Sequence, residues 1–251
     1  MVKVNKNRIN VLNQTEPDIE SGEYVLYWVL MYRRTRYNHA LQRAIEWANE
    51  LGKPLLVFEP LQLEYEWASD RFQQFIIESM KDSYEVFSKS KAGYFPFVET
   101  IEGELNGLLE SLVSKASVVI SDDYPAYFIP QMAAKGEGIV KCKYEIVDSN
   151  GLMPIRSAEK EFVRAHDFRR NMHKNIVGHL ESPPEENPLS KLKMSFNEDV
   201  IKATLKKWEP TNFTNINIPE LVSELPVDKS VKASNITGGY KAAKKRMDNF
   251  L

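Results

Sequence analysis

The sequence has little cysteine, no long apolar run and almost no net charge. Cys142 is the single thiol in 251 residues, which excludes an internal disulfide or a multi-cysteine metal site and is typical of a reducing compartment. No stretch reaches the roughly 18 uninterrupted apolar residues of a membrane-spanning helix, and residues 1–22 lack the apolar core of a signal peptide. A net charge of −2 excludes a globally basic nucleic-acid binder. We therefore expect a cytoplasmic protein without membrane contact.

Several motifs that carry chemistry are also missing. Neither of the two common glycine-rich phosphate loops occurs, nor does the G-x-S-x-G turn that carries a nucleophilic serine. His166 and His173 lie seven residues apart on an expected helix, but no acidic or cysteine partner completes a metal set at the usual spacing. We therefore assign no catalytic residue and no metal ligand.

Buried-strand patterns alternate with helical patterns over the first 150 residues. Runs rich in apolar, aromatic and β-branched residues predict strands at 24–31, 54–58, 94–98, 117–121 and 139–147. Apolar residues at spacings of three and four predict helices at 38–51, 69–87 and 105–113, with Ser69 as an N-cap. This order predicts an α/β fold, a Rossmann-like doubly wound five-stranded mostly parallel sheet.

The alternation ends after Asp148. A charged helix is expected over Glu159–Leu180, with apolar residues on one face that can pack against the sheet. A proline-rich stretch follows, and residues 189–235 predict an extended linker with one short helix near 200–208. A new helix is then expected over 240–251. We place the domain boundaries at 1–181 for the α/β domain, 182–235 for the linker and 236–251 for the start of a helical domain.

The carboxyl ends of the predicted strands are where open parallel sheets bind ligands. Arg33, Arg34 and Arg36 follow the first strand and precede a helix N-terminus, where they can hold an anion such as phosphate. Surface salt bridges explain the same cluster equally well. Asp122 and Asp123 follow the fourth strand and can orient a ribose, a ring nitrogen or a metal, although capping of a turn is favoured.

Two further groups of residues have a plain structural interpretation. The tryptophans at 28, 47 and 67 fall on or beside sheet elements, so we interpret them as core or packing residues. The lysines and the arginine of residues 240–251 form a basic helix face, which suits either nucleic acid or solvent.

Several short segments in succession resemble the DNA photolyase and cryptochrome family, specifically its class II-like branch of deoxyribodipyrimidine photolyases. The segments are residues 22–28 (GEYVLYW), 38–41 (NHAL), 53–57 (KPLLV), 67–71 (WASDR), 121–125 (SDDYP), 147–151 (VDSNG), 168–170 (FRR) and 238–243 (GGYKAA). The resemblance covers essentially residues 22–251.

The resemblance implies an antenna domain, meaning an α/β domain that holds a light-harvesting pigment, joined by a linker to a helical domain that binds FAD and damaged DNA. In the family, excited reduced FAD passes an electron to a cyclobutane pyrimidine dimer, a carbon–carbon lyase reaction. The flavin-binding and lesion-binding positions belong to the helical domain, so none is carried over, and we expect no activity from these residues alone.

The pigment in such proteins is an 8-hydroxy-deazaflavin or methenyltetrahydrofolate at the strand ends. By position, the expected lining residues here are Tyr32, Arg33, Asn38, Glu59 and Asp122. Three alternatives remain open. The chain can be a standalone module that binds a nucleotide or pterin-like ligand, a fragment of a cryptochrome-like light sensor, or a regulatory remnant whose final helix contacts a partner.

Overall fold

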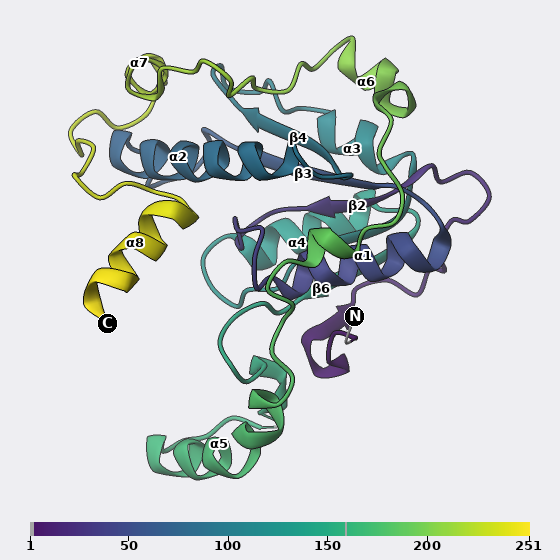
Figure 1. Cartoon of the computed structure of the whole chain (residues 1–251), viewed down its shortest axis with the longest axis vertical. Helices are drawn as coiled ribbons and strands as arrows, with labels where there is room; N and C mark the ends of the chain where they lie inside the picture. Colours follow the sequence, from purple (N-terminus) through teal and green to yellow (C-terminus); the bar gives the residue numbers. More distant parts are fainter. Residues whose placement is uncertain (1–2, 159) are drawn as a thin grey trace.

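The computed structural model describes residues 3–158 and 160–251, and within them a six-stranded sheet in the order β1-β6-β5-β2-β3-β4 forms the centre (Figure 1). The strands are β1 (Ile9–Val11), β2 (Tyr24–Trp28), β3 (Leu55–Leu61), β4 (Gly93–Val98), β5 (Ala116–Asp122) and β6 (Lys143–Val147). All pairs are parallel except β1 with β6. The predicted doubly wound, mostly parallel sheet is confirmed, with an additional antiparallel edge strand.

The edge strand β1 and the turn before it are fixed to the loop that follows β6. The short helix η1 (Lys6–Arg8) precedes β1, and the Arg8 guanidinium donates to four backbone carbonyls of residues 148–152 at 2.8–3.2 Å. Arg8 is buried, so these bonds replace the water it has lost. A strand of three residues is too short to show a sequence pattern, which is why the prediction missed it.

Helices cover both faces of the sheet. Tyr24, Leu26 and Trp28 of β2 point into a core shared with α3 (Leu108–Val113) and α4 (Ile129–Ile139). The residues between them point to the other face, into a core shared with α1 (His39–Leu51) and the end of α2 (Asp70–Phe87). Because successive side chains of a strand alternate between faces, this distribution explains why β2 is apolar and buried throughout.

The starts of α1 and α2 follow from local capping. The Asn38 side chain accepts the N–H of Leu41 at 3.0 Å, and Ser69 accepts the N–H of Phe72 at 3.4 Å, as predicted for Ser69. Gly52 ends α1 in the left-handed region at φ 62°, where glycine is favoured.

Helix α4 corrects the sequence analysis, which expected a strand from residue 139 and no helix before it. Pro130 lies in the first turn, where no hydrogen-bonded N–H is needed. Gly136 faces the sheet, because a Cβ at this position would lie 2.9 Å from Trp28 and from the Tyr144 hydroxyl. The two glycines at 136 and 138 weakened the helical pattern, and β6 begins at Lys143.

Helix α5 (Ala165–Leu180) projects away from the sheet (Figure 1). It follows the short helix η2 (Ile155–Ser157). The expected start at Glu159 lies outside the described residues. The expected packing of this helix against the sheet is wrong: no residue of α5 is buried in the part of the chain that the structure describes.

Residues 182–239 run back over the α/β body. They contain η3 (Pro188–Lys191), η4 (Glu198–Ile201), α6 (Lys202–Leu205) and α7 (Ile218–Glu224). Leu189 joins the core on the α1 face and Trp208 joins the core on the α3 face, while Phe213 and Val222 form a third cluster with α2. The prediction of one short helix here missed α7.

The final helix, α8 (Tyr240–Phe250), lies beside α2 (Figure 1). Lys241 pairs with Glu85 at 2.5 Å and lies 3.7 Å from Asp82. No helix in residues 3–158 and 160–251 combines the length and apolar character needed to cross a membrane.

Candidate functional site

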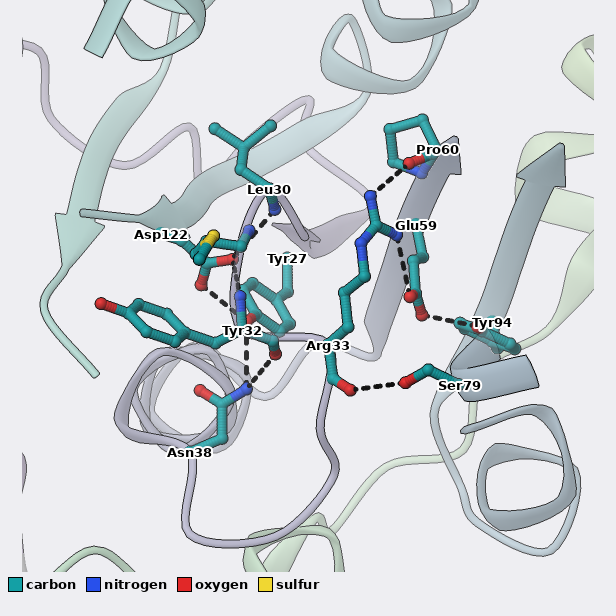
Figure 2. Close-up of polar contacts among 11 residues, drawn as sticks. Tyr27, Leu30, Tyr32, Arg33, Asn38, Glu59, Pro60, Ser79, Tyr94 and Asp122 are labelled. Atoms are coloured by element: carbon teal, nitrogen blue, oxygen red, sulfur yellow. Dashed lines mark hydrogen bonds and ion pairs between the residues drawn. The ribbon is translucent and has the colours of Figure 1, made fainter. Parts of the chain in front are cut away.

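The chain order creates a switch point between β2 and β5. From β2 the sheet grows outward through β3 to β4, and the chain then returns to β5 on the other side of β2. Ligands of open parallel sheets bind in the crevice that such a reversal leaves at the carboxyl ends. The five predicted lining residues lie at or beside this point (Figure 2).

Asp122 ends β5 and is completely buried. One carboxylate oxygen accepts the backbone N–H groups of Leu30, Met31 and Tyr32 at 2.7–3.0 Å, and the other accepts the Tyr27 hydroxyl at 2.8 Å (Figure 2). Burial raises the pKa of Asp122, whereas these four donors favour the charged form. Since a carboxylate offers about four acceptor positions, the side chain is fully used in holding the loop after β2.

Asn38 and Tyr32 fix the same loop from its other end. The Asn38 amide donates to the Tyr27 hydroxyl and to the carbonyls of Tyr32 and Arg34 at 3.0–3.1 Å. The Tyr32 hydroxyl donates to the Asp123 carbonyl at 3.2 Å. Both side chains are buried, so their bonds are internal.

Arg33 and Glu59 form a second polar group beside the first. The Arg33 guanidinium donates to Glu59 at 2.9 Å and to the Pro60 carbonyl at 2.8 Å, while the Tyr94 hydroxyl donates to the second Glu59 oxygen at 2.6 Å (Figure 2). Burial, followed by the neighbouring Glu59 charge, raises the pKa of Tyr94 well above its ordinary value. Arg33 therefore takes part in a largely buried salt bridge, and not in the surface salt bridge that the sequence suggested.

The other charged residues of these loops are also engaged. Arg34 donates to the Ser149 carbonyl at 2.8 Å, and Arg36 pairs with Glu186 at 2.5 Å. Asp123 pairs with Arg156 at 2.8 Å. No group of three or more His, Cys, Asp or Glu that could hold a metal occurs among the residues described.

A cavity of about 150 Å³ opens next to the switch point, at the carboxyl ends of β2, β3 and β4. Its lining includes Trp28, Phe58, Pro60, Gln62, Leu105 and Met132. Trp28 is 3% exposed, and its indole N–H has no hydrogen-bond partner within the described part of the chain. An unpaired buried donor is costly, so a ligand acceptor here would gain a ready partner.

A wider recess of about 480 Å³ adjoins this cavity, since Gln62, Glu64, Met132 and Lys135 line both. Its walls are aromatic and come from the loop after β3 and the start of α4: Tyr65, Trp67, Tyr127 and Phe128. Trp67 is 64% exposed, so its interpretation as a packing residue is wrong. Tyr127 is strained at φ 60°, a conformation that aromatic residues rarely adopt and that is frequent at ligand sites.

None of the five predicted residues lines either of these two cavities. They lie behind the residues that line the cavity. Pro60 connects the two groups, because it lines the cavity and its carbonyl accepts a hydrogen bond from Arg33. The aromatic residues that line the recess were not among the predicted site residues. Their placement in two loops at strand ends, at 65–67 and 127–128, is the pattern that could have identified them.

The chain thus has a doubly wound α/β fold with a cavity at the carboxyl ends of its strands, which is where such folds bind ligands. No known protein-family model matches the chain. A deoxyribodipyrimidine photo-lyase of Methanothermobacter thermautotrophicus is 30% identical over 174 residues, 69% of this chain and 38% of the relative. The resemblance to the photolyase and cryptochrome family is confirmed over these residues.

The chain thus spans less than half the length of the curated relative that it matches. A bacterial class III photolyase from Agrobacterium tumefaciens aligns in structure with a TM-score of 0.47 and 14% identity, over 72% of this chain and 38% of that one. Assignment to the class II-like branch stays a prediction.

Proposed function

We propose that this chain supplies the antenna and scaffold region of a light-dependent DNA repair photolyase. The observation that carries the proposal is the paired cavity with the unpaired Trp28 N–H, in a chain related to a deoxyribodipyrimidine photo-lyase. Repair of cyclobutane dimers in DNA, and the FAD that drives it, are proposed for a full-length protein with a helical domain, as in the family.

The cavity and the recess together offer the space, aromatic walls and few polar groups that a planar heteroaromatic pigment requires. Trp28 would donate its N–H to a ring carbonyl or nitrogen, and the aromatic side chains of the recess would stack on the ring system. Lys135 and Glu64, which border both spaces, would contact the polar substituents. Either an 8-hydroxy-deazaflavin or methenyltetrahydrofolate has this character, and when bound it supplies light absorption.

In this proposal the five predicted strand-end residues do not contact the ligand but support the wall of the cavity. Asp122, Asn38 and Tyr32 hold the loop after β2, at whose base Trp28 lies. Arg33 and Glu59 hold Pro60, which forms part of the cavity wall. These residues would keep the cavity wall rigid and exclude water from the side of the cavity that Trp28 lines, so that a ligand meets a preformed surface.

The test is a fluorescence titration of the 251-residue chain with each pigment. Trp28→Phe keeps an aromatic ring and removes the donor, so the affinity should fall by roughly fivefold, the equivalent of about 1 kcal/mol for one hydrogen bond. Trp47→Phe is the matched control, because the Trp47 N–H donates to Glu145 at 3.0 Å and borders neither cavity.

Two results would contradict the proposal. One is a wild-type chain that binds neither pigment at concentrations of tens of micromolar. The other is an equal loss of affinity in both tryptophan variants, which would point to a general change in stability rather than to a contact with the ligand.

A further inference from the structure

Helix α5 differs from the rest of the molecule in charge. Residues 160–180 contain five Lys or Arg against two Asp or Glu, in a chain whose totals are 33 and 35. Three of the four histidines of the chain also lie on this helix. The excess of cations is therefore local and would be hidden in the net charge of −2.

The arginines and the lysine of α5 have no partner among the described residues, whereas His166 lies 3.5 Å from Asp167. Each arginine from Arg8 to Arg156 makes at least one hydrogen bond or ion pair. In the described part of the chain, by contrast, Arg169, Arg170 and Lys174 have no acidic group within 4.0 Å and no hydrogen-bond acceptor. No described residue pairs with these three charges, which leaves them available to a partner.

These side chains share one exposed face of the helix. At 3.6 residues per turn, spacings of three and four bring residues to the same side. The exposed residues at these spacings form the α5 stripe: His166, Arg169, Arg170, His173 and Lys174. Met172 and Ile176 lie beside the stripe and are half-buried, and the whole helix projects from the body (Figure 1).

We propose that the α5 stripe binds the phosphate backbone of duplex DNA. From His166 to Lys174 the stripe is about 12 Å long at 1.5 Å per residue, which matches the axial length of three to four phosphates on one strand. A membrane surface fits less well, because an interfacial helix buries an apolar face opposite its charged one, and the side of α5 opposite the stripe carries the polar residues Asn171 and Asn175.

This DNA contact goes beyond the proposed antenna function and does not depend on it. The stripe lies within the residues assigned above to the α/β domain, whereas the family assigns lesion binding to the helical domain. It carries no base-reading geometry, so it would add affinity without sequence preference.

The experiment measures fluorescence anisotropy of a labelled 20-base-pair duplex with the 251-residue chain across a salt series. Each phosphate contact contributes about −0.9 to the slope of log binding constant against log salt concentration. Three such contacts should therefore lower the binding constant roughly 40-fold when the salt is raised from 50 to 200 mM. The triple variant Arg169→Gln, Arg170→Gln, Lys174→Gln should lose this share and flatten the slope by about 2.7.

The matched control removes three other exposed cations: Lys89→Gln, Lys202→Gln, Lys206→Gln. It makes the same change in net charge and should retain the wild-type slope. If folding of the triple variant is in question, circular dichroism checks it, and the single variant Arg170→Gln should flatten the slope by about 0.9.

Three outcomes would overturn the proposal: no duplex binding at 20 mM salt, an equal loss in both triple variants, or capture by anionic lipid vesicles without duplex binding. The first would remove the DNA partner, the second would reduce the effect to net charge, and the third would assign the stripe to a membrane surface. None of them bears on pigment binding at Trp28.

Discussion

Two neighbouring regions at the carboxyl ends of the strands differ in how their polar groups are satisfied. At the switch point, Asp122 accepts four hydrogen bonds and the Arg33–Glu59 pair is closed by Pro60 and Tyr94. One layer away, the Trp28 N–H has no partner among the described residues, and its side chain lines a cavity that adjoins an aromatic recess. The comparison teaches that the charged residues at these strand ends build the loop, while the space for a ligand lies beside them.

The strongest test of the closed region is Asp122→Ala. It would leave the N–H groups of Leu30, Met31 and Tyr32 and the Tyr27 hydroxyl without their acceptor, so the free energy of unfolding should fall by about 3–5 kcal/mol. Urea denaturation measures it. Asp123→Ala is the control: its side chain makes an ion pair with the half-exposed Arg156, and the loss should stay below about 1 kcal/mol. Equal losses would show that Asp122 is not the clamp of the loop.

Gly136→Ala tests how tightly the cavity wall is packed. The new Cβ would lie 2.9 Å from Trp28 and the Tyr144 hydroxyl, so one of them must shift, at about 1–3 kcal/mol. Gly138→Ala, on the same helix, meets nothing within 4 Å and should instead stabilise the chain by up to about 1 kcal/mol. Thermal unfolding compares the two. The prediction also requires that Gly136→Ala weakens pigment binding and that Gly138→Ala does not.

His39 gives the closed region a pH dependence. Burial, and then the charges of Arg8 and Arg34, lower the pKa of His39 to about 3 from 6.5. The unfolded chain therefore binds a proton more readily than the folded one between these values, and stability falls as the pH drops below 6.5. From pH 7 to pH 5.5 this group should account for a loss of about 1.3 kcal/mol.

The check on His39 is urea denaturation at both pH values. His39→Gln should remove that share of the pH dependence, while His173→Gln, at an exposed position of α5, should leave it unchanged. The prediction fails if the wild type and the His39 variant lose stability in parallel.

The smallest expected effect on stability concerns the open region. Trp67 is 64% exposed, so Trp67→Ala should change the free energy of unfolding by less than about 0.5 kcal/mol. Pigment affinity should nevertheless fall, because the ring forms part of the recess. A variant that binds both pigments as tightly as the wild type would remove Trp67 from the site and sharpen the boundary between the two regions.

Local sequence patterns were sufficient for the parts of the fold that local physics determines. Ser69 and Asn38 carry their own capping chemistry, and the apolar run of β2 reflects burial on both faces. Helix α4 was missed because its two glycines have low helix propensity, and the reason for Gly136, close packing against Trp28, is not visible in the sequence. Helix α7 was missed although Asn217 caps it and Pro219 lies in its first turn.

The candidate site shows the same limit. The switch-point residues could be located, because strand order determines where they lie. It could not be predicted that their polar groups are fully hydrogen-bonded within the protein. This depends on contacts between residues about 90 positions apart, such as Asp122 with Tyr32. Trp28 looks like any core tryptophan in the sequence, and only its tertiary surroundings leave the N–H unpaired.

The attachment of β1 has a practical consequence for handling the protein. Arg8 and the pairing of β1 with β6 cover one edge of the sheet. Removing residues 3–11, or straining them with a bulky fusion, would expose the backbone groups of β6 to strands of other copies. Size-exclusion chromatography of such a deletion is expected to show aggregates, so affinity tags are better separated from Ile9 by a flexible spacer.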